Sequence, residues 1–99
     1  GPMDGEIAYA VSKGALHQMT RSVDRALERR RIIANCLNPG PVDTGYAVGE
    51  THARVARGFP DGRWGTPDDI AATVAFLVGD EGAWIRGQVL DVDGGFSYA

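Results

Sequence analysis

Ile32-Ile33-Ala34-Asn35-Cys36-Leu37-Asn38-Pro39-Gly40-Pro41 is the stretch that decides the fold. Its first six residues are mostly apolar and do not alternate cleanly with polar ones, which is typical of a strand covered on both faces in a parallel sheet. The two prolines that flank Gly40 cannot continue such a strand, so the backbone must turn there. The sequence therefore predicts a strand over 32–37 followed by a sharp turn.

A long amphipathic helix is predicted before this strand, from near Ala8 to Arg30. Apolar residues recur close to the helical period, and charged residues lie opposite them on what we interpret as a solvated face. The apolar residues are Leu16, Met19, Val23, Ala26 and Leu27, and the charged ones are Arg21, Asp24, Arg25 and Glu28.

The segment 43–65 follows the turn and is rich in glycine and proline, with scattered aromatic residues. Such a composition predicts short helical turns at best and is typical of a mobile loop over a site. Gly45 and Gly49 weaken the case for a helix between Thr44 and Arg57, because glycine destabilises helix interiors.

A second helix is predicted from Pro67 to Val78. Thr66 provides an N-cap, Pro67 suits the first helical position, and two acidic residues follow in the first turn. Gly79 ends this helix. Its apolar residues predict a buried stripe made of Ile70, Ala71, Val74 and Leu77.

A second strand is predicted over 88–92, so the order of elements is helix, strand, loop, helix, strand. This order predicts an α/β protein whose last four elements form one right-handed crossover with parallel strands. With 99 residues, the chain forms at most one domain.

Composition argues against several classes of function. A net charge of -3 gives no electrostatic basis for binding nucleic acid or an anionic membrane, and no apolar run is long enough to cross a membrane. The lone Cys36 has no disulfide partner, which is consistent with a cytoplasmic location. His17 and His52 have no Cys or carboxylate at ligand spacing, so no metal site is predicted. We interpret them as a helix-surface and a loop residue.

Tyr9 and Lys13 form the candidate catalytic pair. They are four residues apart, so they share one face of the first helix. An ammonium beside a phenol favours the phenolate, and a Tyr in that setting can exchange a proton with an alcohol or carbonyl oxygen near neutral pH. The same spacing occurs by chance on many helices, so an ordinary surface pair is the alternative on spacing alone.

Taken together, these motifs resemble the C-terminal half of the short-chain dehydrogenase/reductase superfamily, and in particular the 3-oxoacyl-carrier-protein reductases. The resemblance covers nearly all 99 residues. The motifs are Tyr9-x-x-x-Lys13, Asn38-Pro39-Gly40-Pro41-Val42-x-Thr44, Gly62-Arg63-Trp64-Gly65-Thr66-Pro67-Asp68-Asp69, Phe76-Leu77, and Gly87-Gln88 through Asp93-Gly94-Gly95.

This resemblance implies the C-terminal part of a Rossmann-type doubly wound parallel sheet. Residues 1–99 would then be a single partial domain with two parallel strands and two main helices on opposite faces of the sheet. The segment 43–65 would correspond to the substrate loop.

The resemblance also implies roles for individual residues. Tyr9 would be the general acid/base, and Lys13 would assist it and hold the nicotinamide ribose of NAD or NADP. The substrate would be a small carbonyl or alcohol compound. Further cofactor contacts would come from Pro39, Gly40, Val42 and Thr44. Arg86 stands where the family more often has Thr, a departure that we expect to be harmless.

The family's first half is not in this sequence: it holds the glycine-rich dinucleotide turn, the residue that selects NAD or NADP, and a catalytic Ser. We therefore expect the 99 residues alone to be inactive and to bind no cofactor. Two strands seldom stand alone and an open edge invites pairing, so we expect a homodimer or tetramer, or pairing with a separate N-terminal half that restores activity. A non-catalytic self-association or interaction module is the alternative.

Overall fold

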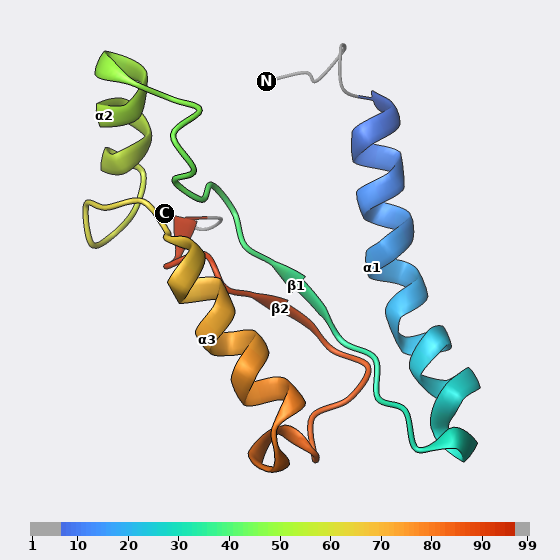
Figure 1. The fold of residues 1–99 in the computed structure, drawn as a ribbon. Helices are drawn as coiled ribbons and strands as arrows, with labels where there is room; N and C mark the ends of the chain where they lie inside the picture. Colours follow the sequence, from blue (N-terminus) through green and yellow to red (C-terminus); the bar gives the residue numbers. More distant parts are fainter. Residues whose placement is uncertain (1–6, 97–99) are drawn as a thin grey trace. The chain divides into compact units, whose positions relative to one another are not determined.

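A computed structural model describes residues 7–96, which divide into two compact units. The first unit comprises residues 7–36 and 85–89, and the second comprises residues 37–84 and 90–96. The elements in chain order are α1 (Ile7–Leu27), η2 (Glu28–Arg30), β1 (Cys36–Asn38), α2 (Gly49–Arg57), α3 (Pro67–Val78), η3 (Asp80–Gly82) and β2 (Val89–Asp91) (Figure 1).

The strands β1 and β2 form a two-stranded parallel sheet, which confirms the predicted α/β class (Figure 1). The Cys36 N–H donates to the Gln88 carbonyl at 2.8 Å, and the Val92 N–H donates to the Asn38 carbonyl at 2.9 Å. The placement of α1 and α3 on opposite faces of this sheet stays a prediction.

Each strand has three residues, so the predicted ranges 32–37 and 88–92 were too long. Just before β1, the side chain of Asn35 replaces backbone hydrogen bonds that a longer strand would make. The Asn35 amide nitrogen donates to the Ile85 carbonyl at 3.1 Å, and the Asn35 amide oxygen accepts from the Gln88 N–H at 3.0 Å.

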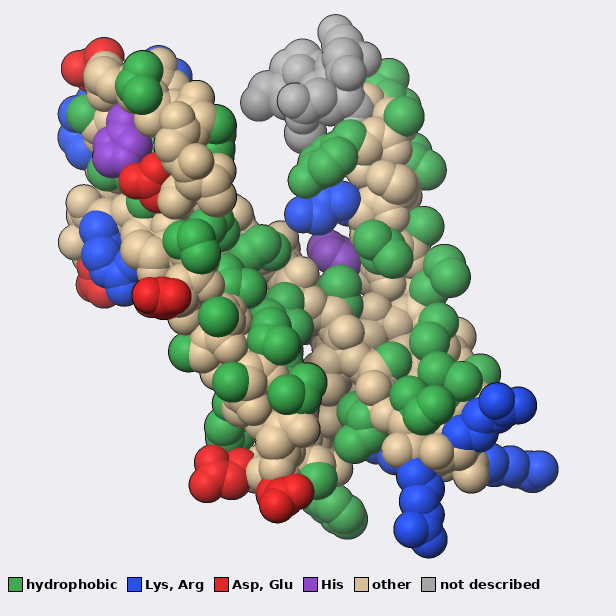
Figure 2. Space-filling view, in the orientation of Figure 1, with side chains coloured by type: hydrophobic (Ala, Val, Ile, Leu, Met, Phe, Trp, Pro, Cys, Tyr) green, Lys and Arg blue, Asp and Glu red, His purple; other side chains and the backbone are tan. Residues whose placement is uncertain are grey.

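In the first unit, α1 and the turn of η2 together confirm the long helix predicted from near Ala8 to Arg30. The predicted assignment of a buried apolar face and a solvated charged face is wrong for this helix, because its buried residues are Thr20 and Asp24. Apolar side chains such as Leu16 and Met19 are exposed, and Figure 2 shows green side chains along α1 and blue ones at its C-terminal end.

Asp24 was predicted on the solvated face of this helix, and the structure instead gives its carboxylate two partners. It accepts from Arg86 Nε at 2.7 Å and from the Ala34 N–H at 2.9 Å. These donations hold the pKa of Asp24 below its ordinary value, the Arg86 contact contributing most. The carboxylate is thereby a long-range anchor, since Asp24 and Arg86 are 62 residues apart in sequence.

In the second unit, Phe59 and Trp64 are the buried hydrophobic residues among those described. The helix α2 has nine residues, which corrects the prediction of short helical turns at best. Gly49 is its first residue and has φ +60°, so the glycine lies at the helix start, where its freedom does no harm.

The helix α3 begins and ends where the sequence predicts. The Thr66 side chain accepts from the Asp69 N–H at 3.2 Å, and the Asp69 carboxylate accepts from the Thr66 N–H at 2.8 Å, which is a capping box. The predicted buried stripe is not buried, and Val74 is 43% exposed. Ile70 and Leu77 are half-buried, whereas Ala71 and Val74 are exposed, so the apolar stripe is only partly covered by the described residues.

No helix of the described residues has the length and apolar character that spanning a membrane requires.

Candidate active site

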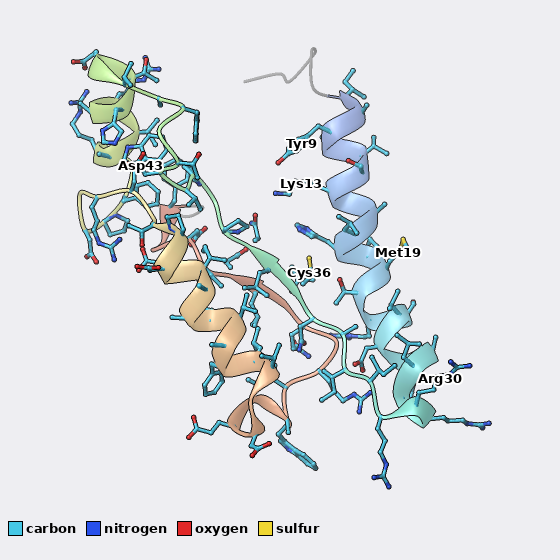
Figure 3. The ribbon with its side chains drawn as sticks, viewed as in Figure 1. Tyr9, Lys13, Met19, Arg30, Cys36 and Asp43 are labelled. Carbon is cyan, nitrogen blue, oxygen red and sulfur yellow. The ribbon has the colours of Figure 1, made fainter. Side chains whose placement is uncertain are left out.

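Tyr9 and Lys13 lie one turn apart on α1 and point to the same side of the helix, whereas Met19 lies on another side (Figure 3). The Lys13 ammonium is 5.5 Å from the centroid of the Tyr9 ring. Tyr9 is more than half exposed, so its hydroxyl can meet a small molecule from outside. The predicted spacing thus brings an ammonium over the phenol.

The Lys13 ammonium pairs with no carboxylate within residues 7–96. An uncommitted ammonium retains three donors for oxygen atoms of a ligand. The pair therefore offers a proton-transfer group and a cationic hydrogen-bond donor on the same helix face.

The turn after β1 gathers the other four predicted site residues, Pro39, Gly40, Val42 and Thr44, into one short segment of the second unit. Gly40 has φ +63°, and a Cβ there would come within 2.9 Å of the Asp93 Cβ, so only glycine fits. Val42 forms an isolated parallel bridge with Gly65.

Thr44 lies at the exposed end of this turn. Its hydroxyl and its N–H make no hydrogen bond to another residue of the part of the chain that the structure describes. These two donors fit the oxygen atoms of a phosphate or ribose, the kind of group that a dinucleotide presents.

Sequence reasoning missed a cluster of side chains next to Thr44. His52 Nε2 lies 2.9 Å from Asp43 Oδ2, and the His52 ring stacks on Trp64 with centroids 5.0 Å apart. The interpretation of His52 as a loop residue was wrong, because it lies on α2. No spacing rule pairs residues 43 and 52, since their meeting depends on how α2 folds back.

A cavity of about 480 Å³ lies in the second unit, between the segment around Phe59 and the turn at 91–95. None of the six predicted site residues lines it. Three of the four carboxylates that line it have partners in the fold: Asp69 pairs with Arg63 at 2.8 Å, Asp91 accepts from Asn38 at 3.0 Å, and Asp93 accepts from the Gly95 N–H at 3.0 Å.

In residues 7–96 there is no group of three or more His, Cys, Asp and Glu side chains placed to hold a metal ion.

Comparison with known proteins gives a consistent set of relatives. A family model described as enoyl-(acyl carrier protein) reductase matches residues 2–97. The uncharacterized oxidoreductase YjdA of Bacillus subtilis is 46% identical over 96 residues, which are 97% of this chain and 38% of the relative. The 3-oxoacyl-[acyl-carrier-protein] reductase FabG of Chlamydia muridarum is 33% identical over 96 residues, 94% of this chain and 39% of that protein.

Solved structures agree with these relatives. A short-chain dehydrogenase/reductase from Serratia marcescens is 39% identical and superposes with a TM-score of 0.83, over 93% of this chain and 38% of that one. A blue fluorescent protein from a metagenomic library, solved in complex with NADPH, is 44% identical with a TM-score of 0.80, over 90% of this chain and 37% of that one. The chain thus spans about two fifths of the length of the proteins it matches.

Proposed function

The chain belongs to the short-chain dehydrogenase/reductase superfamily, and we propose that it is the C-terminal half of an NAD(P)-dependent oxidoreductase acting on a carbonyl or alcohol substrate. The observation that carries this proposal is the Lys13 ammonium 5.5 Å from the centroid of the Tyr9 ring. The other half of the enzyme would supply the glycine-rich dinucleotide turn.

Tyr9 is the general acid/base of the proposed reaction. In the direction of reduction its phenol gives a proton to the carbonyl oxygen, and in the direction of oxidation its phenolate takes the proton of the alcohol. A bound nicotinamide would supply the hydride to the carbonyl carbon, or accept it from the alcohol carbon. The Lys13 ammonium stabilises the phenolate form, because an adjacent positive charge favours the anion.

The chain's own residues have free donors for such a cofactor. Lys13 would hold the ribose, and Thr44 would donate to phosphate oxygen atoms; both are uncommitted within residues 7–96. Pro39, Gly40 and Val42 would shape the turn beside the nicotinamide. The relative solved with NADPH supports a nicotinamide cofactor.

The 99 residues alone are proposed to be inactive. A doubly wound fold binds a dinucleotide through amides of its first glycine-rich turn and the following helix N-terminus. Without these groups and the catalytic Ser, the chain does not position its reactants, a contribution that can reach ~7–11 kcal/mol of the barrier. We propose that it acts by pairing with an N-terminal half or within a homodimer or tetramer.

The test fuses this chain behind the part of the Bacillus subtilis relative that precedes the matched region. Tyr9→Phe should lower kcat for reduction of a 3-oxoacyl test substrate by about 10²–10⁴-fold, because it removes the proton donor. The matched control is Tyr46→Phe, which removes the same hydroxyl from an exposed residue (68%) of the 43–65 segment; any effect should fall on KM for the substrate, and kcat should be unchanged.

Lys13→Ala in the same fusion should lower kcat and also raise KM for the cofactor, because it removes both a ribose contact and the charge beside the phenol. Turnover that survives Tyr9→Phe would reject the catalytic assignment of Tyr9, whereas a folded fusion without any turnover would favour the non-catalytic interaction module. Micromolar NAD(P)H binding by the 99-residue chain, measured by calorimetry, would reject the proposed inactivity of the chain alone.

A further inference from the structure

Asp43, His52 and Trp64 form a cluster in the second unit that we name the loop clamp. His52 Nε2 lies 2.9 Å from Asp43 Oδ2, and the two ring planes of His52 and Trp64 are inclined by 18°. Trp64 Nε1 donates to the His52 carbonyl at 2.9 Å. His52 is therefore held from one side by a carboxylate and from the other by an indole.

The loop clamp ties three parts of the second unit together. Asp43 lies between Val42 and Thr44, and its N–H donates to the Gly65 carbonyl at 2.8 Å. His52 belongs to α2, and Trp64 lies just before the cap of α3 with 4% of its surface exposed. The two ends of the 43–65 segment and the helix between them thus meet at His52.

The charged neighbours of His52 leave Asp43 as its ionic partner. On α2, Glu50 pairs with Arg57 at 3.1 Å and Arg54 is exposed; beyond Trp64, Arg63 pairs with Asp69. The pKa of Asp43 lies below its ordinary value because His52 and the Gly45 N–H donate to its carboxylate. Asp43 is therefore ionised wherever a histidine changes charge, between pH 5 and 8.

We propose that His52 is a positioning residue that holds α2 and Trp64 against the turn carrying Asp43 and Thr44. Protonation of His52 would strengthen its contact with Asp43. A neutral imidazole gives Asp43 a hydrogen bond, whereas an imidazolium gives it a charge-assisted one, which is stronger. That this segment contacts the carbonyl substrate rests on the proposed function. In the complete reductase, the clamp would then set KM for the substrate while Tyr9 and Lys13 set the chemistry.

The first experiment uses the 99-residue chain with Trp84→Phe, which leaves Trp64 as the sole indole. A stacked imidazolium quenches indole fluorescence more than a neutral imidazole does, so Trp64 emission should fall as the pH is lowered from 8 to 5. His52→Gln keeps a hydrogen-bonding side chain but cannot titrate, and it should abolish this pH dependence. The matched control is His17→Gln, which lies on α1 in the first unit and should preserve it.

Asp43→Asn is the second variant and decides the matter if His52→Gln fails to fold by circular dichroism. It keeps an acceptor for the Gly45 N–H but removes the charge that attracts an imidazolium to this position, so it should reduce the fall of Trp64 emission between pH 8 and pH 5. A pH dependence unchanged by both substitutions would overturn the proposal. So would a Trp64 emission maximum typical of an exposed indole at pH 8.

The second experiment measures the fusion protein. His52→Ala should raise KM for the carbonyl substrate by about tenfold, the effect of losing one hydrogen bond to a charged group, with kcat and KM for the cofactor unchanged. A fall in kcat without a change in KM would overturn the positioning role. Because the fluorescence result needs no catalysis, a folded but inactive fusion counts against the proposed function alone and does not affect the test of the clamp.

Discussion

Among the described residues, the side chains buried in the first unit are the polar Thr20 and Asp24, whereas those buried in the second include the aromatic residues Phe59 and Trp64. Asp24 gains its partners from far along the sequence, through Arg86. In the second unit the ring centroids of Phe59 and Phe96 are 4.7 Å apart, and Trp64 stacks on His52, twelve residues before it. The helix that carries Tyr9 and Lys13 thus depends on a distant charged anchor, and the 43–65 segment depends on aromatic packing.

Arg86 has a structural role that its position in the sequence did not indicate. The sequence suggests a harmless departure from the family pattern, but the structure makes Arg86 the cationic partner of a buried carboxylate. Its guanidinium also donates to the Ile32 carbonyl at 3.4 Å. The residue therefore links α1 to the segment that enters β1.

Trp64→Ala should have the largest effect on stability. It empties the most buried aromatic position of the second unit and should lower the free energy of unfolding by about 3–5 kcal/mol. Urea denaturation followed by circular dichroism measures this loss. Trp84→Ala is the matched control: Trp84 is 97% exposed, so its removal should change the free energy by less than about 0.5 kcal/mol. Equal losses from the two substitutions would refute an aromatic core in the second unit.

Asp24→Asn should have the next largest effect and should act on the first unit. Asparagine can still accept from the Ala34 N–H, but it turns an NH₂ donor toward the Arg86 guanidinium. We expect the thermal midpoint to fall by about 5 °C, and hydrogen exchange to rise in α1 more than in α3.

Glu28→Gln is the control for Asp24→Asn. Glu28 contacts Arg25 at 3.4 Å on an exposed surface, where such pairs contribute little, so the midpoint should hardly move. If both substitutions lowered the midpoint equally, net charge rather than the buried anchor would explain the effect.

How far the sequence predicts the fold depends on how local each determinant is. Thr66, Pro67 and Asp69 lie within four residues, so the start of α3 follows from capping rules alone. The burial of Asp24 does not, because it depends on Arg86 at the other end of the chain. The strand lengths were overestimated for a related reason: the Asn35 side chain bonds where ladder amides were expected.

The candidate site divides in the same way. Tyr9 and Lys13 are one helical turn apart, so their shared face was readable from spacing. His52 was not, because its pairing with Asp43 needs a helix that begins at a glycine, and composition argued against that helix. Gly49 is the first residue of α2 and does not lie in its interior, and the sequence pattern did not show where this helix begins.

Thr66→Ala should weaken only the local determinant of α3, its N-terminal cap. Loss of the side-chain acceptor for the Asp69 N–H should cost about 1 kcal/mol and reduce helicity by circular dichroism. Thr73→Ala is the control in the same helix. The Thr73 hydroxyl donates to the Asp69 carbonyl at 3.3 Å within the helix, a contact of little net value. A larger loss from Thr73→Ala would show that packing, rather than capping, stabilises α3.

Acid should have the smallest effect on stability. The substitution Arg63→Gln should change the acid response of the second unit alone. The Arg63 guanidinium and the Thr66 N–H donate to Asp69 and hold its pKa at about 2, below the ordinary value of 3.8. Because the pKa in the folded state is lowered, the stability that Asp69 contributes is present above pH 3.8 and is lost as the pH falls toward 2. Asp24 in the first unit follows the same sign.

Arg63→Gln should raise the pKa of Asp69 toward its ordinary value, so that α3 loses helicity at a higher pH while the response of α1 is unchanged. Carboxyl carbon chemical shifts of Asp69 and Asp24, followed by NMR between pH 6 and pH 2, measure the two titrations separately. Asp68→Asn is the control, since Asp68 makes no side-chain hydrogen bond within residues 7–96 and its removal leaves the Asp69 titration in place. A parallel shift of the Asp24 titration in Arg63→Gln would show that the two units do not respond independently to charge.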